Sequence, residues 1–293
     1  MRRKNVLASL LILYCFSGQL LFGAVADDPA AAEAKDPPPP AKEKKETTLS
    51  RFIKDDIEMW TAPFHLDPKG SLIFAAVLVG TGVLIANDEA IYRNFKSFQK
   101  NNSWVDSVSP KASVLGDWGI DCGIAGLFVL GGLAFKDKKA RDTGLMALET
   151  LMHTGLLAQV VKHLACRQRP SAENGQDYWF GPGAMFNRYN EDAFARYDSF
   201  LSGHTISAWG LATVIAENYK NHFWVPIACY GLATAVGLSR LTEDTHWFSD
   251  VFVGAVLGYF IGRMVVRNHN RRLQIMPAAT PGGMGLSVSY LFE

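Results

Sequence analysis

Three short stretches of the sequence place cations, histidines and a carboxylate next to apolar segments. In the first, "KHLACRQRP", six residues separate Lys162 from Arg169, and Pro170 follows. Lysine and arginine both donate charge-assisted hydrogen bonds to phosphate or carboxylate oxygens, and an arginine can donate two in parallel. Two cations at one helix end can therefore bind an anion. A single one has a plainer role, in which its charge stays in water and interacts with the helix dipole.

The second stretch, "SFLSGHT", places Ser202, Gly203 and His204 at the start of another apolar segment. A helix N-terminus presents unpaired backbone N–H groups and the positive end of the helix dipole, and glycine lets an anion approach the backbone closely. The triplet therefore suits a phosphate site whose histidine exchanges protons with the substrate. On its own it is weak evidence, because a histidine at this position can equally belong to the protein core.

The third stretch, "SRLTEDTHWFSD", contains Ser239 and Arg240, then His246, and Asp250 four residues later. On a helix, that spacing places the histidine and the carboxylate one turn apart. A carboxylate beside a histidine holds its tautomer and stabilises its charged form, as in other catalytic triads. Both charged types also have structural roles, because an arginine stabilises a helix C-terminus and an aspartate caps an N-terminus.

The three stretches meet only if the apolar segments around them are suitably arranged. Six such segments cover approximately 71–86, 119–135, 143–165, 205–219, 223–239 and 248–266. They are too long for strands and have too few turn signals, so we predict an all-α fold with six helices. In an antiparallel up-and-down bundle, the end of the third helix, the start of the fourth, the end of the fifth and the start of the sixth share one face. A joint phosphate site then explains the three stretches better than separate structural roles do.

The sequence before these segments indicates export, and the sequence after them indicates a short C-terminal tail. Residues 1–26 have a basic start, an apolar stretch and an A-x-A pattern, which is typical of a cleaved signal peptide, although an uncleaved anchor has a similar pattern. Residues 27–50 predict a Pro-rich disordered linker, and residues 51–70 predict a helix at a membrane interface or packed on the domain. The main domain covers 71–270, and residues 271–293 predict a tail with a short β-hairpin.

Membrane insertion is consistent with the apolar segments but not required by them. Most are about 15–19 residues long, whereas a bilayer crossing takes about 20. Six spans with positively charged loops inside, at 136–141, Lys220 and 267–272, require the N-terminus inside, whereas a cleaved signal peptide leaves it outside. Interior Glu149 and His153 also disfavour helices exposed to lipid. A membrane-embedded bundle and a membrane-associated or soluble one both remain open.

The overall charge excludes partners that are selected by bulk electrostatics. The formal net charge is +1, so no nucleic acid partner is expected, and any function that depends on charge has to be local.

Together the three stretches resemble the signature of the type 2 phosphatidic acid phosphatase (PAP2) superfamily, which also includes bacterial class A acid phosphatases and vanadium haloperoxidases. The resemblance covers about residues 150–265, and the combined spacing is highly specific. It departs from the family pattern at Leu201, because the family usually has a proline before Ser-Gly-His. That proline shapes the loop and takes no part in the chemistry, so we expect activity to survive.

The resemblance implies a PAP2-type helical bundle that hydrolyses phosphate monoesters or diphosphates through a phosphohistidine. It makes His246 the nucleophile, oriented by Asp250, and His204 the general acid and then the general base. The phosphate-binding residues that it implies are Lys162, Arg169, Ser202, Gly203 and Arg240. It implies neither a metal nor a cofactor, and the sequence shows no other cluster of metal-ligand residues.

The substrate class depends on an aromatic-rich segment after Pro170, which contains Tyr178, Trp179, Phe180, Phe186, Tyr189, Phe194 and Tyr197. Such rings suit the headgroup layer of a membrane or a lid over the substrate, and they also suit a well-packed loop. We expect a lipid phosphate as substrate, in the cell envelope, with the site facing the periplasm from the inner membrane or within the periplasm. The alternatives are a soluble periplasmic acid phosphatase acting on small phosphomonoesters, a vanadium-dependent haloperoxidase and a non-catalytic envelope lipid-binding protein.

Overall fold

The computed structural model describes residues 48–172, 176–182, 197–271, 274–280 and 283–289. Over these residues the helices are α2 (Thr48–Thr61), α3 (Pro68–Asn101), α4 (Trp104–Val114), α5 (Trp118–Ala134), α6 (Lys138–Ala165), α9 (Gly203–Asn218), α10 (Trp224–Thr242) and α11 (Phe248–Arg271). The predominantly helical fold that the sequence predicts is confirmed, whereas the count of six helices in the main domain is wrong. The predicted signal peptide and nearly all of the predicted linker lie outside the described residues.

The helices differ from the prediction in two ways: α3 continues through a polar stretch, and α4 is an additional helix. α3 begins after Asp67, whose carboxylate accepts a hydrogen bond from the N–H of Gly70, and it runs well past the predicted end at residue 86. Its polar second half contains Asp88, which is buried and bonded to Arg167. Tertiary contacts of this kind do not show in a hydrophobic pattern. α4 was not predicted, because it is short and contains Pro110.

Capping residues fix where the bundle helices begin. The carboxylate of Asp117 accepts from the N–H of Gly119 (2.9 Å) at the start of α5, and that of Asp137 accepts from the N–H of Ala140 (3.1 Å) at the start of α6. The hydroxyl of Ser202 caps α9. Such side chains satisfy N–H groups that have no partner inside the helix, and each contributes about 1 kcal/mol.

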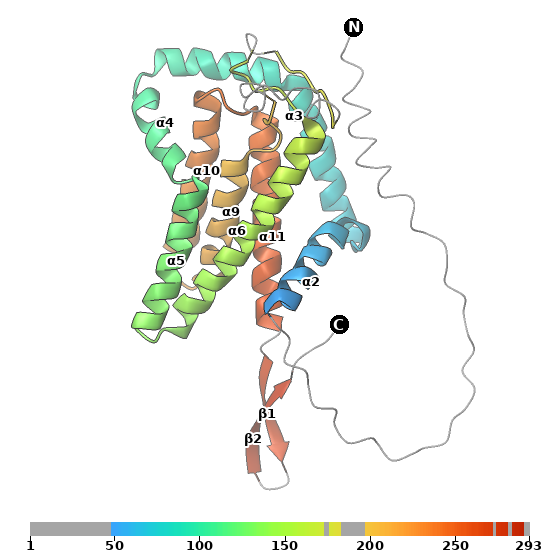
Figure 1. Ribbon diagram of the computed structural model, residues 1–293, viewed down its shortest axis with the longest axis vertical. Coiled ribbons are helices and arrows are strands. Elements are labelled where there is room, and N and C mark those ends of the chain that lie inside the picture. Colours follow the sequence, from blue (N-terminus) through green and yellow to red (C-terminus); the bar gives the residue numbers. More distant parts are fainter. Residues whose placement is uncertain (1–47, 173–175, 183–196, 272–273, 281–282, 290–293) are drawn as a thin grey trace, which may run out of the picture.

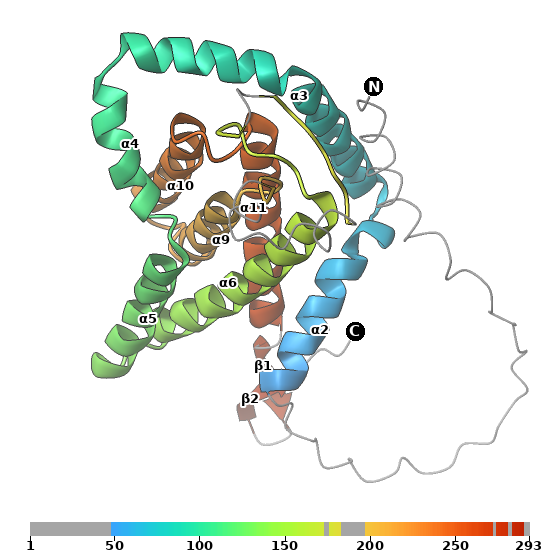
Figure 2. The same ribbon diagram turned by 45° about the horizontal axis from the view of Figure 1, so that its top comes forward.

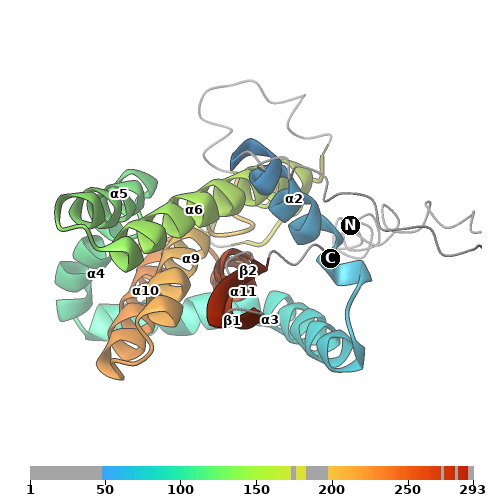
Figure 3. The same cartoon turned by 90° about the horizontal axis from the view of Figure 1, so that it is seen from below.

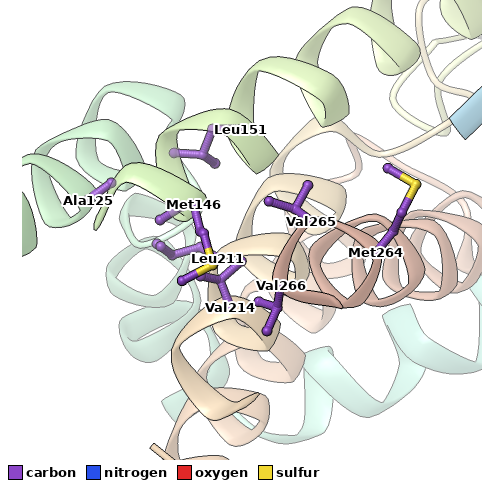
Figure 4. Packing of buried hydrophobic residues seen from close by; sticks show 9 residues of the cluster. Ala125, Met146, Leu151, Leu211, Val214, Met264, Val265 and Val266 are labelled. Carbon is purple, nitrogen blue, oxygen red and sulfur yellow. The ribbon is translucent and has the colours of Figure 1, made fainter. Parts of the chain in front are cut away.

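Helices α5, α6, α9, α10 and α11 form the bundle (Figure 1). One cluster of the core gathers Met146 and Leu151 of α6, Leu211 and Val214 of α9 and Val265 of α11 (Figure 4). These side chains are almost fully buried, and burying each contributes roughly 1.5–3 kcal/mol. The cluster fixes α6, α9 and α11 relative to one another, and the predicted site residues on these helices lie at or next to their other ends.

α9 and α11 approach each other closely along a stripe of glycines on α11. A Cβ atom added to Gly258 would lie 2.4 Å from the main-chain oxygen of Ile206, and one added to Gly262 would lie 2.7 Å from that of Gly210. Small residues at such an interface let two helix backbones come together. The glycine stripe therefore sets the distance between the start of α9 and the start of α11.

α3 turns across one end of the bundle, while α2 lies against α6 and α11 on its side (Figures 1 and 2). At the C-terminal end, β1 (Gln274–Thr280) pairs antiparallel with β2 (Gly283–Ser289), with Gln274 opposite Ser289. These strands lie within the tail for which the sequence suggested a hairpin.

Four of the described helices, α3, α6, α10 and α11, are long and apolar enough to cross a membrane, and the bent pair α4 and α5 raises the number to five if it counts as one span. Large apolar side chains point outward from three elements: Leu72, Leu78 and Val79 on α3, Leu127, Leu130 and Leu133 on α5, and Ile227 and Leu232 on α10. Exposed apolar surface on this scale is typical of a membrane or protein contact. The chain is a membrane protein by these features.

Candidate active site

The three sequence stretches come together at one end of the bundle, beneath α3 (Figure 2). α6 ends at Ala165, and the left-handed conformation of the next residue, Cys166 (φ 41°), turns the chain away from the helix axis. Main-chain hydrogen bonds then join the stretches: the N–H of Ser199 donates to the oxygen of Arg167 (3.0 Å), and the N–H of Ser202 donates to that of Asp250 (3.3 Å). The predicted up-and-down arrangement therefore places the stretches side by side.

The imidazole of His246 is buried just before α11. Its Nδ1 atom lies 2.7 Å from the main-chain oxygen of Ser199, so Nδ1 carries the proton and donates it. Nε2 then has the lone pair that a nucleophile needs. Asp250 is farther away, with its Oδ2 atom 3.7 Å from Nδ1. The hydrogen bond that orients the ring therefore comes from a main-chain carbonyl, and Asp250 acts on the ring mainly through its charge.

Asp250 is held by three other donors. Its carboxylate accepts from Nη1 of Arg167 (2.6 Å), from the hydroxyl of Ser199 (2.5 Å) and from the N–H of Trp247 (2.8 Å). Ser199 thus contacts both Asp250 and His246, through its hydroxyl and its carbonyl. A carboxylate with this many partners stays ionised and cannot rotate away from the histidine.

Arg167, which is itself fully buried, is the centre of a charge network that the sequence did not predict. Besides Asp250, its guanidinium donates to Asp177 through Nε (2.9 Å) and Nη2 (2.8 Å), to Asp88 (2.7 Å) and to Ser249 (2.7 Å). Although burial works against the charge, the carboxylates of Asp250 and Asp177 raise the pKa of Arg167. Arg167 lies inside the quoted stretch "KHLACRQRP", so the residue type was visible, but its partners come from α3, α11 and a loop.

The two predicted cations of the first stretch share an internal anion, Asp198. Arg169 donates to its carboxylate through Nε (2.7 Å) and Nη2 (3.0 Å), and Nζ of Lys162 donates to the same carboxylate (3.2 Å). Burial raises the pKa of Asp198, but the charges of Lys162 and Arg169 lower it by more, so that it lies below its usual value. The position between the two cations therefore suits an anion, and the sequence analysis did not identify the residue that occupies it.

Arg240, the third predicted cation, is buried near the end of α10. It donates to the carboxylate of Glu243 and to the hydroxyl of Ser113 on α4. Its charge also acts on His204, so it lies close to the second stretch. α4 thus supplies a hydrogen-bond acceptor to the site even though it lies outside the predicted helices.

The start of α9 forms another wall of the site. The hydroxyl oxygen of Ser202 accepts two hydrogen bonds from Thr205, one from the Thr205 hydroxyl (2.8 Å) and one from the Thr205 N–H (3.4 Å). A Cβ atom added to Gly203 would lie 3.9 Å from Nζ of Lys162. The ammonium group of Lys162 therefore lies next to the N-terminus of α9. Burial, together with the charges of Arg240 and His246, lowers the pKa of His204 to about 4.

His246 is influenced by the two cations of the first stretch. Burial, together with the charges of Lys162 and Arg169, lowers its pKa to about 4. The structure therefore brings together all eight predicted site residues: His246, His204, Asp250, Lys162, Arg169, Ser202, Gly203 and Arg240. Cations, a helix N-terminus and a neutral histidine with a free Nε2 converge, which is an arrangement that can bind a phosphoryl group and attack it.

Part of the aromatic segment packs over the charge network. Trp179 stacks on the guanidinium of Arg167, whose Cζ atom lies 4.6 Å from the centroid of the Trp179 ring. The ring centroids of Trp179 and Phe200 are 5.1 Å apart. Phe180 contacts Tyr197 edge-to-face at 4.8 Å. Phe186, Tyr189 and Phe194 of the predicted lid lie outside the described residues.

Comparisons with known proteins bear on this site directly. Residues 143–274, from within α6 to the first residue of β1, match the family model of the PAP2 superfamily. A lipid A 1-phosphatase of Porphyromonas gingivalis is 36% identical over 80 residues, which are 27% of this chain and 18% of that protein. The match therefore spans less than a fifth of the relative's length.

Two crystal structures superpose on this chain. The transmembrane PAP2-type phosphatidylglycerolphosphate phosphatase from Bacillus subtilis superposes with a TM-score of 0.50 at 22% identity, over 67% of this chain and 96% of the other. LpxE of Aquifex aeolicus superposes with a TM-score of 0.46 at 18% identity, over 61% and 93%. The family match covers all three stretches and nearly all of the helices that carry them, so residues 143–274 are similar to the PAP2 superfamily.

Proposed function

We propose that the protein is a phosphatase that hydrolyses a lipid phosphate monoester or diphosphate through a phosphohistidine intermediate, without a metal ion. The observation that carries this proposal is the hydrogen bond from Nδ1 of His246 to the carbonyl of Ser199 (2.7 Å). It favours the tautomer whose Nε2 can attack phosphorus, and the Lys162 and Arg169 charges that act on this ring support the binding of a phosphoryl group beside it.

In the first step, Nε2 of His246 forms a bond to phosphorus while the phosphorus–oxygen bond to the leaving group breaks. His204 donates a proton to the departing oxygen, and Asp250 stabilises the positive charge on the His246 ring. In the second step, His204 takes a proton from a water molecule, the water oxygen bonds to phosphorus, and the phosphorus–nitrogen bond breaks. Lys162, Arg169 and Arg240 stabilise the charge on the phosphoryl oxygens in both steps.

A lipid substrate is favoured by the surroundings of the site. The outer surfaces of α3, α5 and α10 are apolar, and the site lies at one end of helices that are long enough to cross a membrane. A site at a bundle end lies at headgroup depth when the helices span, where a lipid phosphate is found. The names of the relatives, a lipid A 1-phosphatase and a phosphatidylglycerolphosphate phosphatase, point the same way. We further propose that the chain is exported and that this end faces the periplasm.

The test is phosphate release by purified protein in detergent, with EDTA present. A phosphatidic acid in mixed micelles, an isoprenyl diphosphate and p-nitrophenyl phosphate are compared side by side. We expect a strong preference for a lipid substrate. A His246→Ala variant should release no phosphate, while His222→Ala, a histidine in the link between α9 and α10, should match the unmodified protein. Turnover by His246→Ala would contradict the nucleophile assignment.

The same experiment separates the alternatives. Equal or better use of p-nitrophenyl phosphate would indicate a soluble-type acid phosphatase specificity. Halide oxidation after addition of vanadate and peroxide would indicate a haloperoxidase, because vanadate binds to the same kinds of residue as phosphate. No activity on any substrate, with vanadate still bound, would favour a non-catalytic lipid-binding protein.

A further inference from the structure

Helix α2 lies beside α6 (Figure 3), and a second cluster of possible metal-ligand side chains lies between these two helices, away from the candidate active site. It consists of Asp55 on α2 and Glu149 and His153 on α6, and one ligand atom from each lies within 4.8 Å of the others. His153 precedes Lys162 by nine residues on the same helix, which is about 14 Å along the axis. The cluster is not visible in the sequence because Asp55 lies 94 residues before Glu149, although Glu149 and His153 are four residues apart.

His153 is held in one orientation from two sides. Its side chain is fully buried (0% exposed), and the ring of Phe52 stacks on it with centroids 4.4 Å apart and planes 4° from parallel. Nδ1 lies 3.3 Å from the carboxylate of Asp56. A carboxylate only accepts hydrogen bonds, so Nδ1 carries the proton of the neutral ring and Nε2 carries the lone pair.

The lone pair on Nε2 of His153 lies near the carboxylates of Glu149 and Asp55, which also accept hydrogen bonds rather than donate them. Nε2 lies 4.0 Å from a carboxylate oxygen of Glu149, and it has no hydrogen-bond partner among the residues that the structure describes. Asp55 is buried (1% exposed), and its carboxylate accepts from the amide of Asn268 (3.1 Å). A buried lone pair directed at carboxylates is unfavourable unless a cation lies between them.

We propose that Asp55, Glu149 and His153 bind a divalent transition-metal ion, for which Zn²⁺ is the best match. One imidazole nitrogen and two carboxylate oxygens are donors that Zn²⁺ accepts, with a water molecule in the fourth position. In a tetrahedral zinc site the ligand atoms are about 3.3 Å apart, so the three side chains draw together by about 1 Å. Asp56 lies behind His153 as the carboxylate that orients a metal-bound histidine does in other proteins.

The metal ion has a structural role, because it joins α2 to α6. The outer face of α2 carries Ile53, Ile57 and Trp60, which are all exposed. Fixing α2 against the bundle holds these apolar side chains on one surface, where they can enter the headgroup region of a membrane. The ion takes no part in phosphate hydrolysis, so this proposal does not depend on the function proposed above.

The test is metal binding by the full chain in detergent, with any affinity tag removed. Protein stripped with EDTA and then dialysed is titrated with Zn²⁺, and bound metal is measured by mass spectrometry of the element. We expect one tight site per chain. Glu149→Gln and Asp55→Asn should weaken binding about 100-fold, and Asp56→Asn should weaken it about 10- to 100-fold. Asp142→Asn, also on α6 but paired with Arg141, is the matched control and should bind normally.

A second measurement follows hydrogen exchange of α2 with and without the metal. Removal of Zn²⁺ should speed exchange in α2 and leave α9 and α11 unchanged. The proposal would be overturned if unmodified protein bound no more Zn²⁺ than Glu149→Gln. It would also be overturned if hydrogen exchange in α2 did not depend on metal, because a shared proton would then hold the three side chains together. The titration is repeated with His246→Ala, which should bind Zn²⁺ normally, so failure of the metal site and failure of the phosphatase are distinguishable.

Discussion

The Nδ1 atom of His246 hydrogen-bonds to the main-chain oxygen of Ser199, 2.7 Å away. The sequence analysis assigned this role to Asp250, whose carboxylate lies 3.7 Å from the same nitrogen. A main-chain carbonyl cannot be removed by a side-chain substitution, so the proposed nucleophile keeps its tautomer even when Asp250 is changed.

Asp250→Asn should lower kcat by about 100-fold. In serine-protease triads, where the carboxylate sets the histidine tautomer, the corresponding change costs about 10⁴-fold. Here the Ser199 carbonyl maintains the tautomer, so only stabilisation of the charged ring is lost. The measurement is steady-state hydrolysis of the preferred substrate at fixed pH, with thermal unfolding as a check that the Arg167 network has survived. A loss as large as that of His246→Ala would mean that Asp250 does set the tautomer.

Asp198→Asn should make inorganic phosphate and vanadate stronger inhibitors, by about tenfold. The Asp198 carboxylate shares Lys162 and Arg169 with any bound phosphate, and the two anions repel each other across these cations. Asparagine removes the negative charge while keeping an oxygen acceptor. The inhibition constant for phosphate at low salt gives the answer. Weaker inhibition would instead indicate that Asp198 mainly orients Arg169.

The activity of the free enzyme should be highest on the acidic side of neutrality. Burial and the neighbouring cations lower the pKa values of both His246 and His204 to about 4. A lowered pKa keeps His246 neutral, and hence nucleophilic, down to about pH 4. The same shift removes the proton of His204 as the pH rises, so kcat/KM, which reports the free enzyme, should fall toward neutral pH.

Bound phosphate should change this pH dependence. The anion offsets the positive charges that lower the pKa of His204, so the proton is kept to higher pH in the complex. The profile of kcat should therefore extend to higher pH than that of kcat/KM. Identical profiles for the two parameters between pH 4 and pH 8 would contradict the assignment of His204 as general acid.

Gly258→Ala should destabilise the protein by about 1–3 kcal/mol, in the range of other overpacked cores. The new Cβ atom would meet the main-chain oxygen of Ile206 at 2.4 Å, so α9 and α11 would have to separate. Gly231→Ala on α10 is the matched control, since nothing lies within 4 Å of its added Cβ. That control should be neutral or stabilising by up to about 1 kcal/mol. Thermal unfolding in detergent measures both, and equal stability of the two variants would contradict the prediction.

Much of the candidate site follows from local sequence. Lys162, Arg169, Ser202, His246 and Asp250 were identified from their types and spacing, because the chemistry of a phosphate site needs cations, a helix N-terminus and a histidine at helix ends. The helices that carry these residues were also predicted, since their long apolar segments have few alternatives. An antiparallel bundle then brings the ends together whatever its details.

The sequence by itself therefore determined the helical class and pointed to the residues that meet in the candidate site. Only the tertiary structure decided how they are held: Asp88 and Asp177 neutralise Arg167, and Ser199 orients His246. It also extended α3 through a polar stretch and brought α2 against α6. Each of these features rests on a contact between residues far apart in the chain. Polar groups become buried only when such a partner is present, and periodicity along the sequence carries no information about that partner.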